Sequence, residues 1–238
     1  MGRSSNIRMF RKGWWDRLSR RRSQKPKLSR RNLHRLCEEN ATDRRTLVVH
    51  SEDVDYAPYF PNAFTVTKRP DKPADLHVDQ FYREIDQIAS ESYEVILCTG
   101  LLEHVPDPQR LIDELRRILK PGGKVIISAS AVFSIHEGPH DYFHFTPFSF
   151  RRLFADWSRI EMLRGSSRPF ETIAILIQRI MIQCDVSPLA RPLIELTYPI
   201  FPLLDRLIIR QYDKAGNRSP EHEIDSMLPS NMQAVVLK

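Results

Sequence analysis

Seven short runs of apolar, often β-branched residues are spaced along the chain between charged and proline-rich segments. Their composition and their flanking turn residues predict β-strands. The run YEVILC at 93–98 is apolar at consecutive positions, which indicates a strand covered on both faces of a sheet. The expected strands are 45–49, 63–67, 74–78, 93–98, 124–130, 158–165 and 232–238.

The clearest helical pattern follows the fourth run. Asp107 is a suitable N-cap, and Pro108 stands at the first helical position, where its missing N–H is not needed. Large apolar residues then recur with the helical period until the Pro-Gly-Gly turn at 121–123 ends the helix. This stripe consists of Leu111, Ile112, Leu115, Ile118 and Leu119.

Shorter helical patterns occupy 27–39, 82–89 and 146–156. The order strand, helix, glycine turn, strand around 93–130 describes a βαβ unit, whose crossover is right-handed. The fold class expected from this alternation is α/β: a doubly wound, mostly parallel seven-stranded sheet in a three-layer, Rossmann-like sandwich.

Composition limits the class of protein. A length of 238 residues with 41% hydrophobic and 28% charged residues suits one soluble domain with extensions. Cys37, Cys98 and Cys184 are far apart and form no CxxC pair, so neither a disulfide framework nor a cysteine zinc site is predicted. A reducing, cytoplasmic location fits this cysteine usage.

Charge is distributed unevenly. Residues 1–36 hold 13 Lys or Arg and one acid, Asp16, whereas the remainder holds 23 bases and 29 acids. We interpret 1–36 as a basic, partly disordered extension of a domain at 37–238. It lacks the apolar core of a secretory signal; contact with anionic membrane or RNA, or an organellar transit function, are its alternatives. The acidic remainder does not suit sequence-specific nucleic-acid binding.

An apolar insertion at about 170–212 precedes the last predicted strand. Four prolines interrupt it, and no uncharged stretch reaches the ~18–20 residues that a membrane span needs. Packing in a core or a dimer is the ordinary interpretation; a surface for a lipid-linked or hydrophobic substrate is the sharper one. The oligomeric state stays open.

Two segments resemble a known family. The block CTGLLEHVPDPQRLIDELRRILKPGGKVIIS at 98–128 is similar to the fourth strand, helix and fifth strand of class I S-adenosylmethionine-dependent methyltransferases of the type 11 group. HEGPHDYFHFTPFSFRRLF at 136–154 resembles a loop and helix in a subset of them. The resemblance implies S-adenosylmethionine as cofactor and methyl transfer to a small molecule, sugar or lipid-linked substrate. The alternative is an inactive relative that serves as a binding or scaffold subunit.

Cofactor-binding residues follow from the resemblance and from the general rule that open α/β sheets bind ligands beyond the carboxyl ends of their strands. Thr99, Gly100 and Leu101 leave the fourth strand at that edge. The first loop departs from the family's acidic, glycine-rich pattern, because Val48 stands at the acidic position and His50 and Glu52 at the glycines. The expected contacts on this side are Val49, His50, Glu52, Lys68 and Asp79, and weak cofactor affinity is predicted.

Candidate catalytic residues are His104, His140 and Asp141, because an imidazole near neutral pKa can accept a proton and an adjacent carboxylate can orient it. Pinning of a turn by Glu103 and His104 is the plain alternative. His136, Tyr142 and His144 are the expected substrate contacts. Three histidines in nine residues invite a metal interpretation, but their spacing has no regular helix or cysteine partner, and no metal site is predicted.

Overall fold

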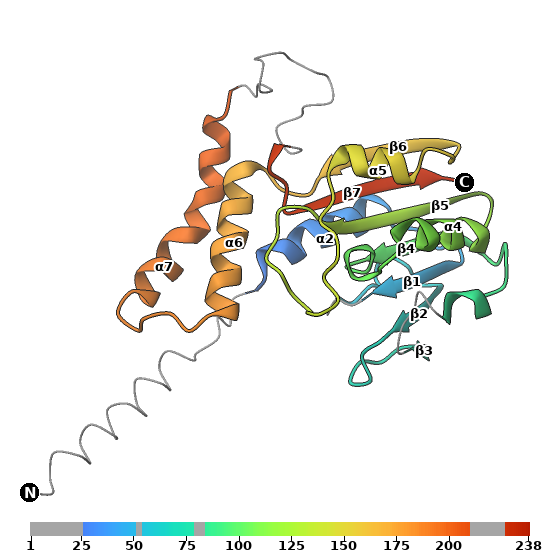
Figure 1. The fold of residues 1–238 in the computed structure, drawn as a ribbon, viewed down its shortest axis with the longest axis horizontal. Helices are drawn as coiled ribbons and strands as arrows, with labels where there is room; N and C mark the ends of the chain where they lie inside the picture. The colour runs from blue at the N-terminus through green and yellow to red at the C-terminus, as the bar shows by residue number, and fades with distance from the viewer. Residues whose placement is uncertain (1–25, 51–53, 79–83, 210–226) are drawn as a thin grey trace, which may run out of the picture.

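A computed structural model describes residues 26–50, 54–78, 84–209 and 227–238, and it shows a sheet with helices on both faces (Figure 1). The strand order is β3-β2-β1-β4-β5-β7-β6. β7 is antiparallel to β5 and β6, and the other pairs are parallel. The strands are β1 Thr46–His50, β2 Ala63–Thr67, β3 Leu76–His77, β4 Tyr93–Thr99, β5 Leu119–Ser130, β6 Arg159–Gly165 and β7 Asn231–Leu237. The expected doubly wound sheet is confirmed.

The helix after β4 forms as the sequence predicts. α4 spans Pro108–Ile118, and the Asp107 carboxylate accepts a hydrogen bond from the Arg110 backbone N–H at 3.1 Å. The helix ends one residue before Leu119, the last apolar residue of the predicted helical pattern. Leu119 is already extended and pairs with Tyr93. Leu119 is nevertheless fully buried, so it belongs to the core through the strand instead of through the helix.

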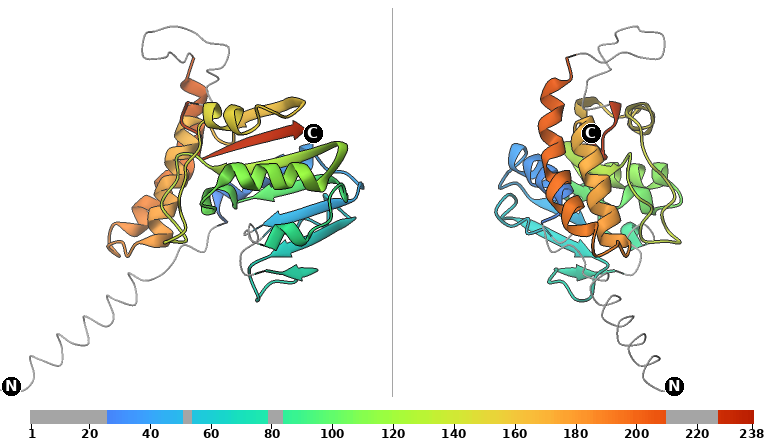
Figure 2. Two further views of the ribbon diagram at one scale, coloured as in Figure 1. Left: turned by 45° about the vertical axis from the view of Figure 1, so that its right-hand side comes forward. Right: turned by 90° about the vertical axis from the view of Figure 1, so that its left-hand side faces the viewer.

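Two apolar layers enclose the sheet, and Figure 2 shows the helices that cover its two faces. One lies under α4 and α5 (Pro147–Leu153), where Phe150 and Phe154 are buried. The other lies under α2 (Leu28–Glu39), which buries Leu33 and Leu36 against the opposite face of the sheet. Residues 28–36 therefore pack with the domain, whereas residues 1–25 of the expected basic extension lie outside the described part of the chain.

Three helical segments between β6 and β7 form what we call the helical insertion: α6 (Pro169–Gln183), α7 (Arg191–Thr197) and the 3-10 segment η3 (Tyr198–Leu207). They stand at one end of the sheet (Figure 1). Two further 3-10 turns, η1 (Ile85–Gln87) and η2 (Leu102–His104), flank β4. Within the described ranges, no helix has the length and apolarity needed to cross a membrane.

Polar groups hold the helical insertion together from inside. The buried Asp205 carboxylate accepts hydrogen bonds from the backbone N–H groups of Phe170 and Glu171, each at 2.8 Å, and so caps the first turn of α6. The Gln178 side chain accepts from the Leu28 N–H at 2.8 Å and donates to the Tyr198 hydroxyl at 3.2 Å. α2, α6 and η3 are thereby tied to one another.

Candidate functional site

The carboxyl ends of β1, β4 and β5 meet at one edge, where His50 pairs with Thr99 and Thr99 with Ser128. Gly100 follows with a φ of +60°, a conformation that glycine adopts without a Cβ clash. The buried Thr99 hydroxyl lies 3.1 Å from the Tyr56 hydroxyl, which ties the chain after β1 to the end of β4. This edge is the ligand-binding edge that the strand order predicts.

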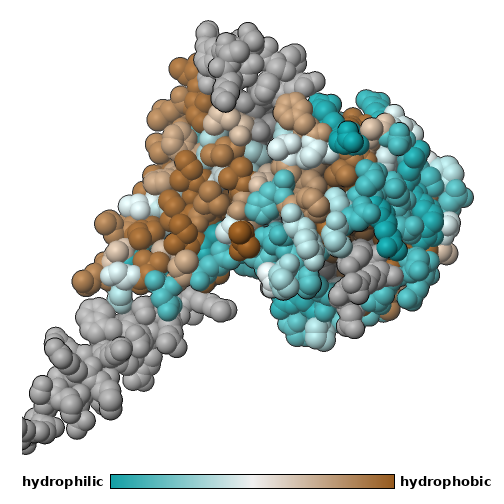
Figure 3. Space-filling view, in the orientation of Figure 1, coloured by the Kyte–Doolittle hydropathy of each residue, from teal (hydrophilic) through white to brown (hydrophobic). Residues whose placement is uncertain are grey.

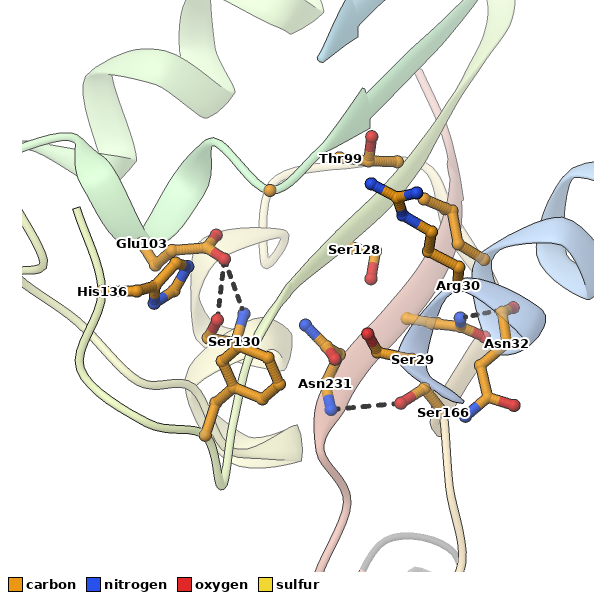
Figure 4. A pocket seen from close by; sticks show the side chains of 14 residues that line it. Ser29, Arg30, Asn32, Thr99, Glu103, Ser128, Ser130, His136, Ser166 and Asn231 are labelled. Atoms are coloured by element: carbon orange, nitrogen blue, oxygen red, sulfur yellow. Dashed lines mark hydrogen bonds between the residues drawn. The ribbon is translucent and has the colours of Figure 1, made fainter. Parts of the chain in front are cut away.

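A polar pocket begins at this edge and extends over β5 and β7 beneath α2 (Figure 4). Hydroxyl and amide side chains dominate its wall, together with the guanidinium of Arg30 and the carboxylate of Glu103. Its lining includes Ser29, Arg30, Asn32, Thr99, Gly100, Glu103, Ser128, Ser130, His136, Ser166, Asn231 and Gln233. Such a wall suits a ligand with several hydrogen-bonding groups.

Glu103 is the most deeply buried acid of this pocket, at 1% exposure. Its Oε1 accepts hydrogen bonds from the Ser130 N–H at 3.2 Å and the Ser130 hydroxyl at 2.8 Å (Figure 4). Burial raises the pKa of the Glu103 carboxyl above its usual range, although the hydrogen bonds and the neighbouring His104 act in the opposite direction. Among the described residues, no donor reaches its Oε2.

The loop that follows β5 returns to the same edge. Its backbone N–H groups at Tyr142 and Phe143 donate to the Glu103 carbonyl, at 2.9 and 3.3 Å, and the Phe145 N–H donates to the Ser130 carbonyl at 2.7 Å. The His104 ring nitrogen Nδ1 lies 3.0 Å from the His140 carbonyl. The structure therefore brings the 136–144 loop against η2, beside Glu103 and His104.

Within this loop, Asp141 does not orient His140 as its position in the sequence suggests. The Asp141 carboxylate accepts from the His136 N–H at 2.8 Å and lies 3.4 Å from His136 Nδ1 and 3.6 Å from His144 Nε2. The exposed ring of His140 instead meets the Tyr142 hydroxyl at 3.0 Å. The reason is geometric: the loop turns at 137–140, so the residue adjacent in sequence faces the other way.

The expected cofactor contacts divide into two groups. Thr99 and Gly100 lie at the strand edge and line the pocket, whereas Leu101 packs against the core. Val49 is buried in the sheet, so only its backbone can face a ligand. Glu52, Asp79 and the side chain of His50 lie outside the described part of the chain.

Lys68, at the end of β2, pairs with Glu137 of the loop after β5. Burial of Glu137 opposes the charged form, but the hydrogen bond and charge of Lys68 outweigh it and hold the pKa of that carboxyl below its usual range. The Lys68 ammonium therefore serves as an anchor that fastens the loop across the carboxyl edge of the sheet.

Sequence reasoning missed the walls supplied by α2 and β7. Ser29, Arg30 and Asn32 reach the pocket because α2 packs over it, a tertiary contact with no local signal. Gln233 did carry a signal, because it is a polar residue within an apolar strand and is 1% exposed. Its amide donates to the Asn32 carbonyl at 3.2 Å, which joins the two walls.

Residues 52–171 match the family described as the methyltransferase domain. The chain belongs to this methyltransferase family. S-adenosylmethionine is the cofactor of the family.

Curated relatives include a ubiquinone biosynthesis O-methyltransferase of Coxiella burnetii, 32% identical over 98 residues, covering 34% of this chain and 42% of the relative. A protein of the same description from Xanthomonas oryzae pv. oryzae is 39% identical over 56 residues, covering 22% of this chain and 23% of the relative. The chain thus spans less than half the length of the curated relatives it matches.

Solved structures support the fold. A SAM-dependent methyltransferase from Archaeoglobus fulgidus superposes with a TM-score of 0.52 at 10% identity, covering 89% of this chain and 93% of that one. A Haemonchus contortus phosphoethanolamine N-methyltransferase 2, solved with phosphomonomethylethanolamine and S-adenosylhomocysteine, gives 0.51 at 13% identity, covering 100% and 59%. The seven-stranded α/β methyltransferase fold is therefore shared across low identity.

Proposed function

We propose that this protein transfers a methyl group from S-adenosylmethionine to a polar group of a small-molecule acceptor that is linked to a lipid. Family membership supports methyl transfer, and the curated O-methyltransferase relatives support a small-molecule acceptor. The polar pocket beside Gly100 carries the proposal, because it places a wall rich in hydroxyls and amides next to the edge where the methyl donor binds.

The donor side of the site fits S-adenosylmethionine in part. Gly100 lets a ligand approach the end of β4 closely, but the first loop offers no glycine between Gly13 and Gly100 for a similar approach at β1. Lys68 stands where an acid would hold the ribose hydroxyls, and it is engaged with Glu137. Affinity for the cofactor is accordingly weak.

Methyl transfer is a displacement in line with the carbon–sulfur bond, so the protein's main task is to align the acceptor atom. Bound S-adenosylmethionine supplies the electrophilic methyl group. The pocket wall orients the acceptor through hydrogen bonds, and α2 covers it from above. His140, whose ring is oriented by the Tyr142 hydroxyl, is the proposed acceptor of the proton, with Tyr142 and His144 of the same loop as proposed substrate contacts.

Two features support the proposal that the acceptor lies at an anionic membrane surface. Six large apolar side chains, each 52–81% exposed, recur at intervals of three or four residues along α7 and η3 and the turn before α7. They are Leu189, Leu193, Leu196, Ile200, Leu203 and Leu207, and we call them the apolar stripe. Figure 3 shows the helical insertion as a broad hydrophobic face.

The distribution of charged residues around the apolar stripe favours an anionic membrane as the surface that contacts it. The two acids of α7 and η3 are both engaged: the buried Asp205 caps α6, and the partly exposed Glu195 pairs with Arg191 at 2.9 Å. Residues 1–25 hold nine Lys or Arg and one acid, and they join the chain where Pro26 accepts a hydrogen bond from Gln178 of α6. Basic residues near an anionic surface contribute about 1 kcal/mol each, and an apolar helix face adds the second signal that stable attachment needs.

Cofactor binding is tested by calorimetry with S-adenosylhomocysteine. We expect weak but measurable binding by the full chain, and at least ~10-fold weaker binding by Gly100→Val, because a β-branched residue is strained at positive φ. Gly138→Ala is the matched control, since an added Cβ there meets no atom within 4 Å. The pair His50→Gly with Glu52→Gly should bind more tightly. Absence of binding by the wild type at millimolar ligand would remove the proposal.

Acceptor class is tested with S-adenosylmethionine carrying a tritiated methyl group and bacterial membrane extracts. We expect label in the butanol-extractable lipid-linked fraction, and loss of it with Ser130→Leu, which fills the pocket. Label confined to the aqueous small molecules would contradict the lipid link while leaving methyl transfer intact.

Membrane contact is tested by co-sedimentation with vesicles of phosphatidylglycerol and phosphatidylcholine, and with phosphatidylcholine alone. Leu193→Ser together with Leu196→Ser should weaken binding at least ~10-fold, because apolar burial in the interface is lost. Ser187→Ala with Thr197→Ala is a control of similar position. A chain that stays in solution and instead dimerises through the stripe, as judged by light scattering, would exclude this contact.

A further inference from the structure

Three side chains from two segments converge beside the polar pocket, whose lining includes Glu103 and His136. Glu103 and His104 come from η2, and His136 from the loop after β5. One ligand atom from each lies within 4.8 Å of the others. The imidazole rings of His104 and His136 meet edge to face, with centroids 4.7 Å apart, and Figure 4 shows the His136 ring beside the Glu103 carboxylate.

The carboxylate of this cluster has an unused ligand atom. Glu103 is 1% exposed, and Ser130 fixes its Oε1 through two hydrogen bonds, so the side chain cannot turn freely. Its buried Oε2 has no hydrogen-bond donor within the part of the chain that the structure describes. An unsatisfied buried carboxylate oxygen is costly, and a cation is a group that would satisfy it.

Both imidazoles are held in the tautomer that a metal requires. Nδ1 of His104 lies 3.0 Å from the His140 carbonyl, and Nδ1 of His136 lies 3.1 Å from the Ser134 carbonyl. A carbonyl oxygen only accepts, so each Nδ1 carries the hydrogen and donates it. The lone pair of each neutral ring is therefore on Nε2, which is the ligand atom in many metal sites.

A second layer supports His136. The Asp141 carboxylate, whose side chain is 3% exposed, lies 3.4 Å from His136 Nδ1 and accepts from the His136 N–H at 2.8 Å. A carboxylate behind a histidine ligand fixes the ring orientation and raises the basicity of the ligand nitrogen. This arrangement explains why Asp141 is turned away from His140.

We propose that Glu103, His104 and His136 bind a divalent transition-metal ion of the zinc type. Two imidazole nitrogens and one carboxylate oxygen are a ligand set that suits Zn²⁺ and its neighbours, whereas Mg²⁺ prefers oxygen ligands alone. Three protein ligands leave a fourth position open toward the pocket. The sequence alone favoured no metal because its three loop histidines were considered together, whereas two of the ligands lie more than thirty residues earlier, on η2.

The test uses the full chain with Cys184→Ser, which removes an exposed thiol that would compete for metal. After chelator treatment, Zn²⁺ alone is titrated in a calorimeter, and Mg²⁺ in a parallel run. We expect one Zn²⁺ per chain, with His136→Ala and Glu103→Gln each weakening binding at least ~100-fold and Asp141→Asn about 10–100-fold, as the loss of a supporting carboxylate does. The parallel titration with Mg²⁺ should show no binding at the same concentrations.

His140→Ala is the matched control, because it removes a histidine from the same loop and keeps the carbonyl that His104 contacts. Circular dichroism checks that each variant is folded, and the conservative Glu103→Gln keeps the size of the buried side chain. Unchanged zinc affinity in both Glu103→Gln and His136→Ala, or no zinc bound by the parent at micromolar concentration, would overturn the proposal. Because the readout is metal binding alone, its failure is independent of methyl transfer.

Discussion

The sheet domain and the helical insertion differ in how many of their large apolar side chains are exposed. The sheet places Leu97 and Ile126 at 0% exposure between two layers of helices. The helical insertion turns Leu193 and Leu196 outward and buries Asp205 instead. The sheet is therefore held mainly by apolar burial, whereas the insertion combines a smaller apolar core, which includes Ile175 and Met181, with a few buried hydrogen bonds.

The difference shows that apolar content alone does not locate a core. Both regions are rich in leucine and isoleucine, and only the distribution of polar partners separates them. In the helical insertion, inward Gln178 and Asp205 satisfy backbone groups of α2 and α6, which leaves the apolar side chains for another surface. A region built this way is suited to an apolar environment on its outer side.

The largest effect should come from truncating the same residue type in each region. Leu97→Ala should lower the free energy of unfolding by about 2–5 kcal/mol, because it opens a cavity in a core that is fully buried. Leu196→Ala, at an exposed position, should change it by less than about 0.5 kcal/mol. Urea denaturation measures both. Equal losses would mean that the stripe is buried in solution.

A smaller effect is expected from Asp205→Ala, which removes the cap of α6. The N–H groups of Phe170 and Glu171 would lose their acceptor, at a cost of about 1–3 kcal/mol. Hydrogen exchange should accelerate in α6 and remain unchanged in β4. Asp205→Asn keeps one acceptor oxygen and should lose less. If exchange accelerated equally in both elements, the insertion and the sheet would unfold as one unit.

The two regions should also differ in the accessibility of their cysteine thiols, a difference that has little effect on stability. Burial raises the pKa of the Cys37 thiol to about 12, and burial with the nearby Glu103 charge raises that of Cys98 further. Both thiols are therefore protonated and enclosed at neutral pH, whereas Cys184, after α6, is exposed. Iodoacetamide should modify Cys184 alone in the native protein, as peptide mass spectrometry would show. Modification of Cys37 without denaturant would contradict the buried position of α2.

Most of the fold was predictable because its elements carry local signals. Period, caps and glycine turns located β2 to the residue and α4 within two residues. Of the helix expected at 82–89, residues 82 and 83 lie outside the described part of the chain, Glu84 is helical, and Ile85–Gln87 form a 3-10 turn. The outward position of the large apolar side chains on α7 and η3 was not predictable, because it depends on which neighbours satisfy Gln178 and Asp205.

The candidate site was predictable along the chain but not across it. The motif around Gly100 and the loop at 136–144 were identified from sequence, and the structure brings them together. The partnership of Asp141 with His136, and the reach of Ser29 and Asn32 into the pocket, depend on tertiary contacts. Sequence distance does not encode these contacts.

The position of β7 in the sheet has a consequence for the order in which the chain assembles during synthesis. β6 has no strand partner in the described sheet other than β7, which lies between it and β5. The ribosome delivers β6 and the whole helical insertion before β7 exists. The first five strands can pair as they emerge, but β6 must wait for the last strand and has an unpaired edge until then. Nascent chains that pause in this interval expose an unpaired strand edge, which a chaperone or a membrane surface would protect.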